Sequence, residues 1–394
     1  MEYRLMFAVF RSARKGLRVL TLPLLALTLA ACDTLPVTNS GVASGDPVQV
    51  ALLVPSGTGD GATESIARSL ENAARLAMRD LNGVTVDLRV YPTAADASLA
   101  AANAEKAVSE GAKIIIGPVY AAPSNAAGRA VAGKGVNVLS FSNNAAIAGG
   151  NLFVMGQTFR NTAERMASYA VSQGKQRFVV VADTGAAGAQ GKSAIQQAVT
   201  AQGASVVGTV EYALSQQDVI ASVPAIRAAV ADNGADALFL TTDTATALPL
   251  LSQLLPEAGV STEATQFMGL TRWDIPAQTL SLPGVQNGWF ALPDQGAASA
   301  FSGQYEAAYG TAPHPIAGLA FDAIAAIGAL ASQGQGDTLT AAALTQGAGF
   351  RGASGIFRLN PDGTNTRGLA VATITDAQVK VLSPAPQRFG GAGF

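Results

Sequence analysis

The sequence predicts an α/β protein made of two similar halves, each built on a mostly parallel sheet. From Val48 onward, short apolar runs alternate with segments whose apolar residues recur at helical spacing, a rhythm typical of βαβ units. The same rhythm starts again near Arg177. In both halves a Gly-Ala step leads into the third strand, at residues 111–112 and 234–235. A repeat of this kind implies two lobes of similar architecture.

The expected elements follow the same order in both halves. For the first half we expect helices at 62–82, at 96–110 and before the last strand, and strands at 48–55, 86–92, 112–118 and 136–142. For the second half we expect helices at 189–202 and 218–233, and strands at 177–183, 204–212 and 235–243. Helical spacing in the first helix predicts one buried stripe, formed by Ile66, Leu70, Ala73, Ala77 and Leu81.

Two further local signals come later in the chain. Asn161 and Glu164 have the spacing of a capping pair that opens a helix. The C-terminal part changes to hairpins, with turns expected at 361–363 and 376–377, because Pro-Asp-Gly and Asp-Ala suit tight reversals.

The first residues have the pattern of a lipoprotein leader. A basic segment precedes an apolar run from Val19 to Ala31, which is shorter than the roughly 20 residues that span a bilayer and typical of a signal peptide. Cys32 follows this run and is the only cysteine, so lipidation would consume a thiol that an oxidising compartment does not favour. We predict a signal peptide at 1–31, acylated Cys32 and a flexible tether at 32–47. The protein would then be a membrane-anchored lipoprotein facing the periplasm, on the inner or the outer membrane.

The charge balance argues against a nucleic-acid partner. Without its first 31 residues, which hold five basic and one acidic side chain, the chain has 20 basic and 26 acidic residues, a net charge of −6. A mildly acidic chain offers no basic surface to a phosphate backbone.

The residues that most catalytic and metal sites need are scarce. His314 is the only histidine and lies between two prolines, which favours a turn residue over a catalytic base or a zinc ligand. The segment 185–193 resembles a phosphate loop, but Ala186 stands where that loop needs glycine. We expect no catalytic residue, no metal and no cofactor. A hydrolase that uses aspartates remains an alternative, and its candidates are Asp243, Asp274, Asp294 and Asp322.

Loops after the carboxyl ends of the strands are the expected ligand site, because connections diverge there in open parallel sheets. Their hydroxyl, amide, aromatic and guanidinium groups suit a small polar molecule. The candidates are Ser56, Tyr120, Ala121, Ser142, Asn143, Asn144, Asp243, Thr244, Thr271, Arg272 and Trp273.

Four segments together resemble one known family. RLAMRDLNG at 75–83, IIIGP at 114–118, FDAIAAIG at 321–328 and GIFRLNPDGT at 355–364 are similar to the type I periplasmic binding proteins, Leu/Ile/Val-binding branch, over roughly 48–382. The resemblance implies two Rossmann-like lobes with parallel sheets, joined by three crossover strands. The crossings would fall near 150–160, 285–292 and 345–352. Lobe 1 would then hold 48–155 and 290–346, and lobe 2 would hold 156–289 and 347–382, before a tail at 383–394.

The resemblance also bears on the ligand. Amino-acid-binding members hold a carboxylate with hydroxyls and amides, and an ammonium with an acidic residue. Here Ala121 stands for the first serine, Ser142 and Asn144 for the later pair, and Thr271 for the acid. We therefore expect a ligand other than a plain branched-chain amino acid, gripped by Arg272 unless Arg272 pairs with Asp274, and stacked on Tyr120 or Trp273.

Three functions are consistent with these residues. The lipid anchor and the altered site resemble the penicillin-binding protein activators, which regulate cell-wall synthesis by contact with a penicillin-binding protein. The alternative is the substrate-binding component of an ABC-type uptake system for amino acids or other small polar solutes, with an ABC permease as partner. The third possibility is the aspartate hydrolase.

Overall fold

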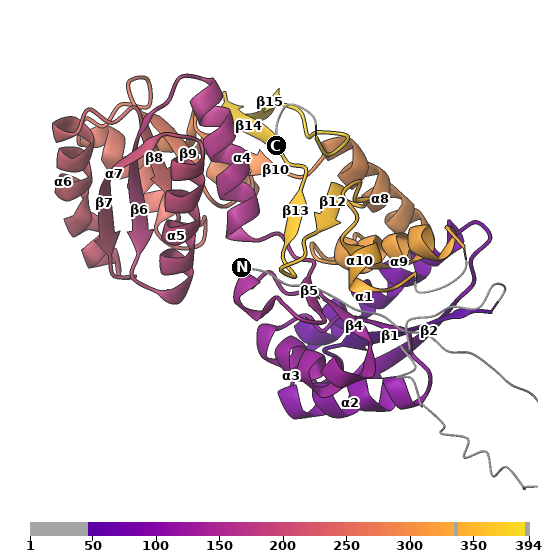
Figure 1. Ribbon diagram of the computed structural model, residues 1–394. Helices are drawn as coiled ribbons and strands as arrows, with labels where there is room; N and C mark the ends of the chain where they lie inside the picture. Colours follow the sequence, from indigo (N-terminus) through magenta and orange to yellow (C-terminus); the bar gives the residue numbers. More distant parts are fainter. Residues whose placement is uncertain (1–45, 335–337, 391–394) are drawn as a thin grey trace, which may run out of the picture. The chain divides into compact units, whose positions relative to one another are not determined.

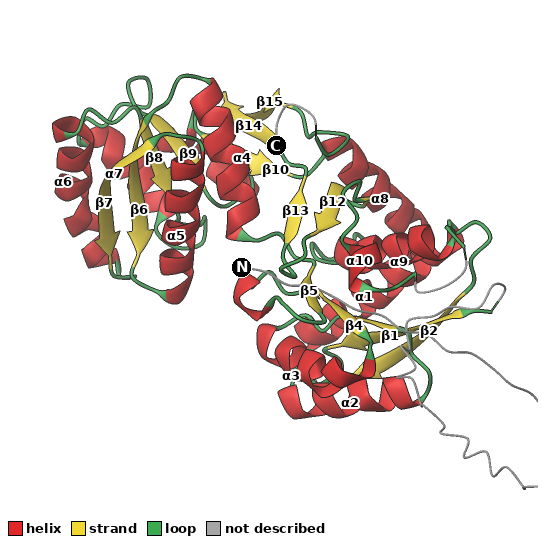
Figure 2. Cartoon of the chain, in the orientation of Figure 1, coloured by secondary structure: helices red, strands yellow, loops and turns green. Residues whose placement is uncertain are grey.

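The computed structural model describes residues 46–334 and 338–390. The chain divides into two units, 1–37 and 38–394, and all the described residues belong to the second. The predicted signal peptide, Cys32 and nearly all of the tether lie outside the described residues. Helices and strands alternate along the chain, as Figures 1 and 2 show, and the α/β class is confirmed.

The first sheet is entirely parallel, with strand order β2-β1-β3-β4-β5. Its interior strands are almost wholly apolar because helices cover both faces of a parallel sheet, and the three isoleucines of β3 are fully buried. Its strands are β1 (Val48–Val54), β2 (Val86–Pro92), β3 (Ile114–Ile116), β4 (Asn137–Ser140) and β5 (Leu152–Val154). The helices between them are α1 (Gly61–Arg79), α2 (Ala97–Ser109), α3 (Ala121–Val131) and the short η1 (Ala132–Lys134) and η2 (Ala145–Ile147).

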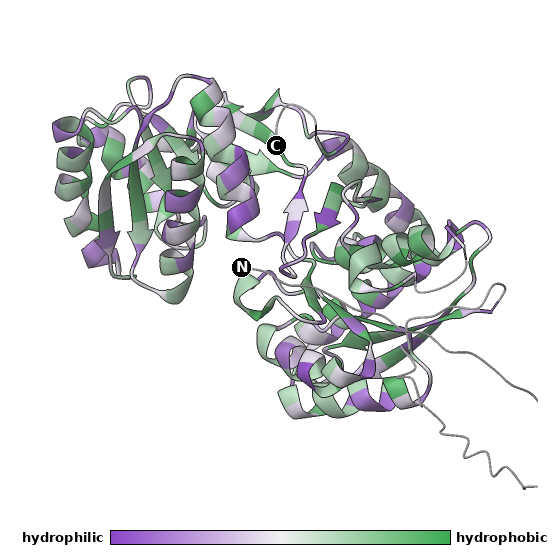
Figure 3. Cartoon of the chain, in the orientation of Figure 1, coloured by the Kyte–Doolittle hydropathy of each residue, from purple (hydrophilic) through white to green (hydrophobic). Residues whose placement is uncertain are grey.

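The second sheet has the order β15-β14-β10-β9-β8-β6-β7. Its parallel strands are β6 (Arg177–Asp183), β7 (Ser205–Tyr212), β8 (Ala237–Leu240), β9 (Gln266–Gly269) and β10 (Trp289–Leu292). An antiparallel hairpin extends it at one edge, formed by β14 (Ala370–Thr375) and β15 (Gln378–Ser383). Its helices are α4 (Phe159–Ser172), α5 (Ala186–Ala201), α6 (Gln216–Asp232), α7 (Leu248–Glu257), η3 (Ala277–Ser281) and η4 (Pro283–Val285). Figure 3 shows apolar colours concentrated on the strands and polar colours on the outer helical surfaces.

A third, antiparallel sheet contains β11 (Phe350–Gly352), β12 (Gly355–Leu359) and β13 (Asn365–Arg367). Phe350 and Phe357 pack in the same core as the first sheet, although they fall in the range expected for lobe 2. Conversely, β10 belongs to the second sheet, although 290–292 fall in the range expected for lobe 1. The helices of this part are α8 (Gln295–Tyr309), α9 (Gly318–Ala331) and α10 (Ala341–Leu344). The lobe boundaries as a whole stay a prediction.

The predicted stripe of α1 is confirmed. Leu70, Ala73 and Ala77 are buried, and Ile66 and Leu81 pack against the same core. Helix α9 approaches the end of α1 closely at Gly328, where an added Cβ would lie 2.3 Å from Leu81 Cδ2. A larger side chain at this helix contact would require the Leu81 side chain to move.

The predicted capping pair of α4 is wrong by one turn. Thr158 is the N-cap, and its hydroxyl accepts a hydrogen bond from the Asn161 amide while the Asn161 side chain accepts one from the Thr158 amide at 2.8 Å. Asn161 thus occupies the third helical position, and Glu164 pairs with Arg160 at 2.7 Å instead. Thr158 is the cap instead of Asn161 because its hydroxyl lies at the start of the helix, where the first backbone amides have no partner within the helix.

Both predicted C-terminal hairpins are confirmed. Strands β12 and β13 pair across residues 360–364, and β14 and β15 pair across Asp376 and Ala377. Asp376 and Ala377 have φ of 54° and 55°, the left-handed conformation that a two-residue hairpin turn requires.

Candidate functional site

A cavity of about 370 Å³ lies beside the carboxyl ends of two strands of the first sheet. Residues after β3 and β4 form one wall, and the first turns of α4 and α5 form the other. The lining residues are Val119, Tyr120, Ala121, Ser142, Asn143, Asn144, Phe159, Ala187 and Gln190. The structure therefore brings together five of the predicted site residues, those from Tyr120 to Asn144.

The polar side chains of this wall bond to their near neighbours. Ser142 Oγ accepts a hydrogen bond from the Asn144 amide at 3.1 Å, and Asn144 Oδ1 accepts one from the Ala146 amide at 3.0 Å. The side chains of Asn143 and Gln190 have no hydrogen bond to any described residue. The wall thus keeps its shape through local turns and leaves hydrogen-bonding capacity for a molecule in the cavity.

Two helices begin at the cavity without a side-chain cap from a described residue. Helix α3 starts after Tyr120 and α5 after Gly185, whereas α1, α2, α4 and α6 start with an Asp, Thr or Ser cap. The first amides of a helix have no partner within the helix and carry partial positive charge. At α5 the Asp183 carboxylate already accepts the Gly185 N–H at 2.8 Å. The first turn of α3 offers the amides of Ala121 and Ala122, since Pro123 has no N–H, and is therefore the better place for an anion.

The predicted residues of the second half do not line this cavity. Asp243 Oδ1 accepts hydrogen bonds from the Ala245 amide at 3.0 Å and from Thr246 Oγ1 at 2.8 Å, which closes a turn. Thr244 Oγ1 donates to the Ile275 carbonyl, and Thr271 Oγ1 donates to the Thr242 carbonyl. These hydroxyls hold the loops after β8 and β9 in place.

Arg272 forms the ion pair that was one of its two expected roles. Its Nε lies 2.9 Å from Asp274 Oδ1, and its terminal nitrogen contacts Asp274 Oδ2. The Asp274 side chain is 13% exposed and that of Arg272 35%. Because both carboxylate oxygens are engaged, the guanidinium in this structure is directed at Asp274.

Trp273 does not offer a stacking face to a ligand, which corrects the sequence-based expectation. Its side chain is fully buried in the core of the second sheet, 6.4 Å from the Phe290 ring. Gly269 and Gly288 make room for it, because an added Cβ would lie 2.3 Å and 2.4 Å from the indole. Tyr120, 40% exposed, remains the predicted stacking residue at the cavity.

Ser56 also lies outside the cavity. It is partly buried after β1, and its carbonyl accepts a hydrogen bond from the Ala94 amide at 2.9 Å. Its place in the fold is therefore a connection between the first two strands.

Sequence reasoning missed Phe159, Ala187 and Gln190. Ala187 and Gln190 follow β6 directly, so the rule that ligands bind after the carboxyl ends of strands would have found them. Phe159 has no comparable signal, because it begins a helix on the far side of a crossing.

The four candidate aspartates do not form one site. Asp294 caps α8 through the Ala297 amide at 2.9 Å, and Asp322 pairs with Arg367 at 3.2 Å in the buried interior. Asp243 and Asp274 have the local partners described above. Within residues 46–334 and 338–390, no group of three or more potential ligand residues could hold a metal ion. His314 lies in a turn, where its Nδ1 accepts the Ile316 amide at 3.4 Å.

A family model described as "Periplasmic binding protein" matches residues 47–378. The chain belongs to this family, whose members bind small molecules, and the resemblance to its Leu/Ile/Val-binding branch is confirmed. Among curated protein sequences, none matches the chain. In the part of the chain that the structure describes, no helix is both long and apolar enough to cross a membrane.

Solved structures share the fold. A candidate branched-chain amino acid ABC transporter from Rhodospirillum rubrum has a TM-score of 0.72 at 20% identity and covers 86% of this chain and 100% of its own. A branched-chain amino acid ABC transporter periplasmic ligand-binding protein from Burkholderia xenovorans has a TM-score of 0.65 at 17% identity, over 87% and 97% of the two chains. A solute-binding protein from R. palustris in complex with benzoate has a TM-score of 0.56 at 18% identity, over 89% and 99%. These TM-scores show a common fold.

Proposed function

We propose that the protein is a non-catalytic receptor for a small organic acid that lacks an α-ammonium group. The observation that carries this proposal is the composition of the cavity: of its nine described lining residues, none is charged, and the uncapped start of α3 faces it. Amides at a helix start attract a carboxylate. An ammonium group would be desolvated there without a counter-charge, which is costly.

Each wall of the cavity has a part in this proposal. The carboxylate lies on the first turn of α3, with Ser142 and Asn143 as additional hydrogen-bonding groups. Tyr120 and Phe159 supply apolar and aromatic surface for the body of the ligand. The benzoate complex of the R. palustris protein supports a ligand of this kind.

The partner we propose is an ABC-type permease. The structural neighbours from Rhodospirillum rubrum and Burkholderia xenovorans are named as components of ABC transporters, and the family match covers residues 47–378. In this role the receptor captures the acid and delivers it to the permease, and no bond of the ligand is broken.

Acylated Cys32 would hold the receptor at the membrane. Two or more acyl chains give stable anchoring where one chain does not. A Cys32→Ser variant should leave the membrane fraction and appear as uncleaved, unacylated protein. Fractionation identical to that of the wild type would mean that another segment anchors the chain.

Calorimetric titration tests the ligand class. We expect saturable binding of benzoate or another non-amino carboxylate, and no binding of leucine, isoleucine or valine. Micromolar affinity for any of these three amino acids would overturn the proposal, and so would a panel of organic acids without a single binder.

Two serines provide a matched pair for locating the site. Ser142→Ala should lower the affinity for the carboxylate ligand by about tenfold, which corresponds to one hydrogen bond to a charged group. Ser56→Ala should leave the affinity unchanged, because Ser56 lies outside the cavity. Equal losses in both variants would place the ligand elsewhere.

An activator of a penicillin-binding protein is the second candidate. Amino-acid receptors carry a serine and an acid at the positions of Ala121 and Thr271. The replacement of both favours a protein without a role in amino-acid uptake. Stimulation of a cell-wall synthase by the ligand-free protein would support this role. Genes for a permease and an ATPase beside its own gene would support uptake.

A further inference from the structure

A second cavity, of about 590 Å³, lies where α4 and α5 meet the hairpin of β12 and β13. It shares no lining residue with the first cavity. Its lining residues are Arg160, Asn161, Glu164, Arg165, Ser168, Ala198, Ala201, Gln202, Arg358, Asn360, Pro361, Asp362, Thr366 and Arg367. Four of these are arginines and two are acids, so the lining carries an excess of positive charge.

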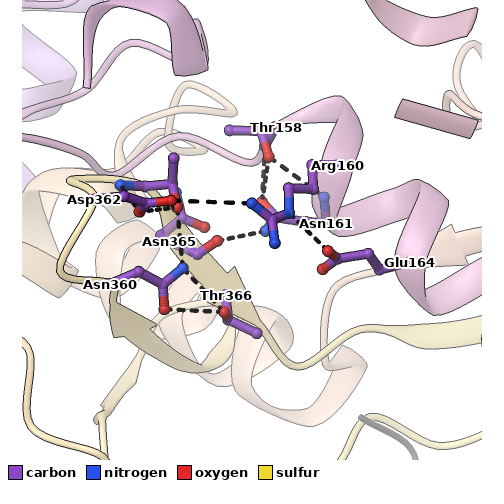
Figure 4. A network of polar contacts seen from close by, with 9 residues as sticks. Thr158, Arg160, Asn161, Glu164, Asn360, Asp362, Asn365 and Thr366 are labelled. Atoms are coloured by element: carbon purple, nitrogen blue, oxygen red, sulfur yellow. Dashed lines mark hydrogen bonds and ion pairs between the residues drawn. The ribbon is translucent and has the colours of Figure 1, made fainter. Parts of the chain in front are cut away.

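One arginine is neutralised at the edge of this cavity. Arg160 pairs with Glu164 at 2.7 Å and lies 4.0 Å from Asp362, as Figure 4 shows. Asp362 also accepts the Thr364 amide at 2.9 Å. Both acids of the lining are thus directed at Arg160 and leave the other guanidiniums without a carboxylate from the lining.

Two more arginines are fixed by groups outside the lining. Arg165 donates to the Leu369 carbonyl at 2.7 Å and to Ser383 Oγ at 2.7 Å. Arg367 pairs with the buried Asp322 at 3.2 Å and donates to the Met155 carbonyl at 3.1 Å. Burial lowers the pKa of Arg165, which indicates a desolvated wall where an anion would be strongly attracted.

Arg358 differs from the other three. Its Nε is buried and has no hydrogen-bond partner among the described residues, and its guanidinium lies 4.8 Å from the centre of the Phe389 ring. A buried donor without an acceptor costs free energy. Ser168 and Gln202 line the same cavity, and their side chains have no hydrogen bond to any described residue either. An acceptor-rich molecule in the cavity would give hydrogen-bond partners to Ser168, to Gln202 and to the terminal nitrogens of Arg358, which have no hydrogen bond to a described residue.

We propose that this cavity is a second binding site, for a metabolite-sized molecule with a carboxylate or phosphate group, and that Arg358 is its principal anchor. A guanidinium matches both oxyanions because it donates two parallel hydrogen bonds. The volume is in the range of small-molecule sites, roughly 300–1,000 Å³. A ligand here would bridge α4 and β12 and so stabilise the folded protein.

The test uses the full chain, with inorganic phosphate and citrate as separate probes. We expect saturable binding of at least one of them by calorimetry, accompanied by a rise in melting temperature. Tighter binding of phosphate would assign a phosphorylated ligand, and tighter binding of citrate would assign a carboxylic acid. The absence of saturable binding by both probes at millimolar concentration would overturn the proposal.

Variants locate the bound anion. Arg358→Gln should weaken binding by about tenfold to a hundredfold, because it removes a charged donor. Arg351→Gln is the matched control: Arg351 is exposed on the neighbouring strand β11 and does not line the cavity. Equal affinities in these two variants would overturn the assignment of Arg358.

Gln202→Glu keeps the test decisive if Arg358→Gln folds poorly. Gln202 is exposed at the end of α5, and a carboxylate there should repel the probe and reduce its affinity at least severalfold. Ser56→Ala, outside both cavities, should leave phosphate binding unchanged. Phosphate binding that Arg358→Gln weakens, in a protein that fails to bind benzoate, would overturn only the receptor proposal, so the two failures are distinguishable.

Discussion

Two groups of polar residues in this protein differ in how far their hydrogen bonds reach along the chain. Around β13, Asn365 Nδ2 donates to the carbonyls of Val154 and Gly156 at 2.8 Å each, and Arg367 pairs with Asp322. At the first cavity, Ser142 and Asn144 bond to residues only two positions away. The hydrogen bonds of Asn365 span 211 and 209 residues and the ion pair of Arg367 spans 45, whereas the second group shapes a turn.

This difference separates polar groups that maintain the fold from those available to a ligand. Asn161 belongs to the first group as well, because its Nδ2 donates to the Asn365 carbonyl at 2.8 Å and so joins α4 to β13 (Figure 4). The donors of such buried side chains are engaged in hydrogen bonds within the protein. Side chains in local turns keep part of their hydrogen-bonding capacity exposed, so substitutions should affect stability in the first group and binding in the second.

The largest expected effect is that of breaking the buried ion pair. Burial raises the pKa of Asp322, which Arg367 and the Ala353 amide oppose. Arg367→Met would leave Asp322 without its counter-charge, and we expect a loss of about 3–5 kcal/mol in the free energy of unfolding. Urea denaturation measures it. The double variant Asp322→Leu/Arg367→Met should recover much of the loss, and a single variant as stable as wild type would contradict the comparison.

A matched pair of asparagines sharpens the comparison. Asn365→Ala removes the two hydrogen bonds that its side-chain amide donates to the Val154 and Gly156 carbonyls, and should cost about 1–3 kcal/mol. Asn144→Ala removes one local turn bond and should cost less than about 1 kcal/mol. Its effect should instead appear as weaker carboxylate binding. Equal losses of stability in the two variants would show that the sequence separation between hydrogen-bonded residues does not distinguish the two groups.

Arg272→Ala tests whether an ion-paired loop residue contributes to binding. Because Arg272 is partly exposed and directed at Asp274, its removal should change stability by about 1 kcal/mol or less. Carboxylate affinity should stay within about twofold. A loss of tenfold or more by calorimetry would mean that Arg272 leaves Asp274 and grips the ligand.

The smallest expected effect is on how steeply the stability of the protein falls at acidic pH. Although burial alone would raise the pKa of Asp362, hydrogen bonds from Thr364 and the charge of Arg160 lower it overall. The stabilisation that follows is present above the unfolded value of 3.8 and is lost as pH falls through the lowered value. Urea midpoints measured between pH 5 and pH 3 should therefore fall less steeply for Asp362→Asn. Identical slopes for the variant and the wild type would show that ionised Asp362 does not stabilise the folded protein.

Local patterns predicted much of the architecture. The alternation of strands and helices, the stripe on α1 and both C-terminal hairpins depend on residues close together in sequence, whose periodicity and turn preferences are readable directly. The cluster from Tyr120 to Asn144 was predicted for the same reason. Carboxyl ends of neighbouring parallel strands lie at one edge of a sheet, so strand order suffices to bring these loops together.

The tertiary structure decided the features that depend on which elements pack together. Trp273 is buried because Gly269 and Gly288 leave space for its indole, which the sequence around Trp273 does not indicate. Strand β10 joined the second sheet and β11 to β13 joined the core of the first because of pairings made across the chain. Periodicity records which face of an element is buried, whereas the identity of the covering partner is set by packing between separate elements of the chain.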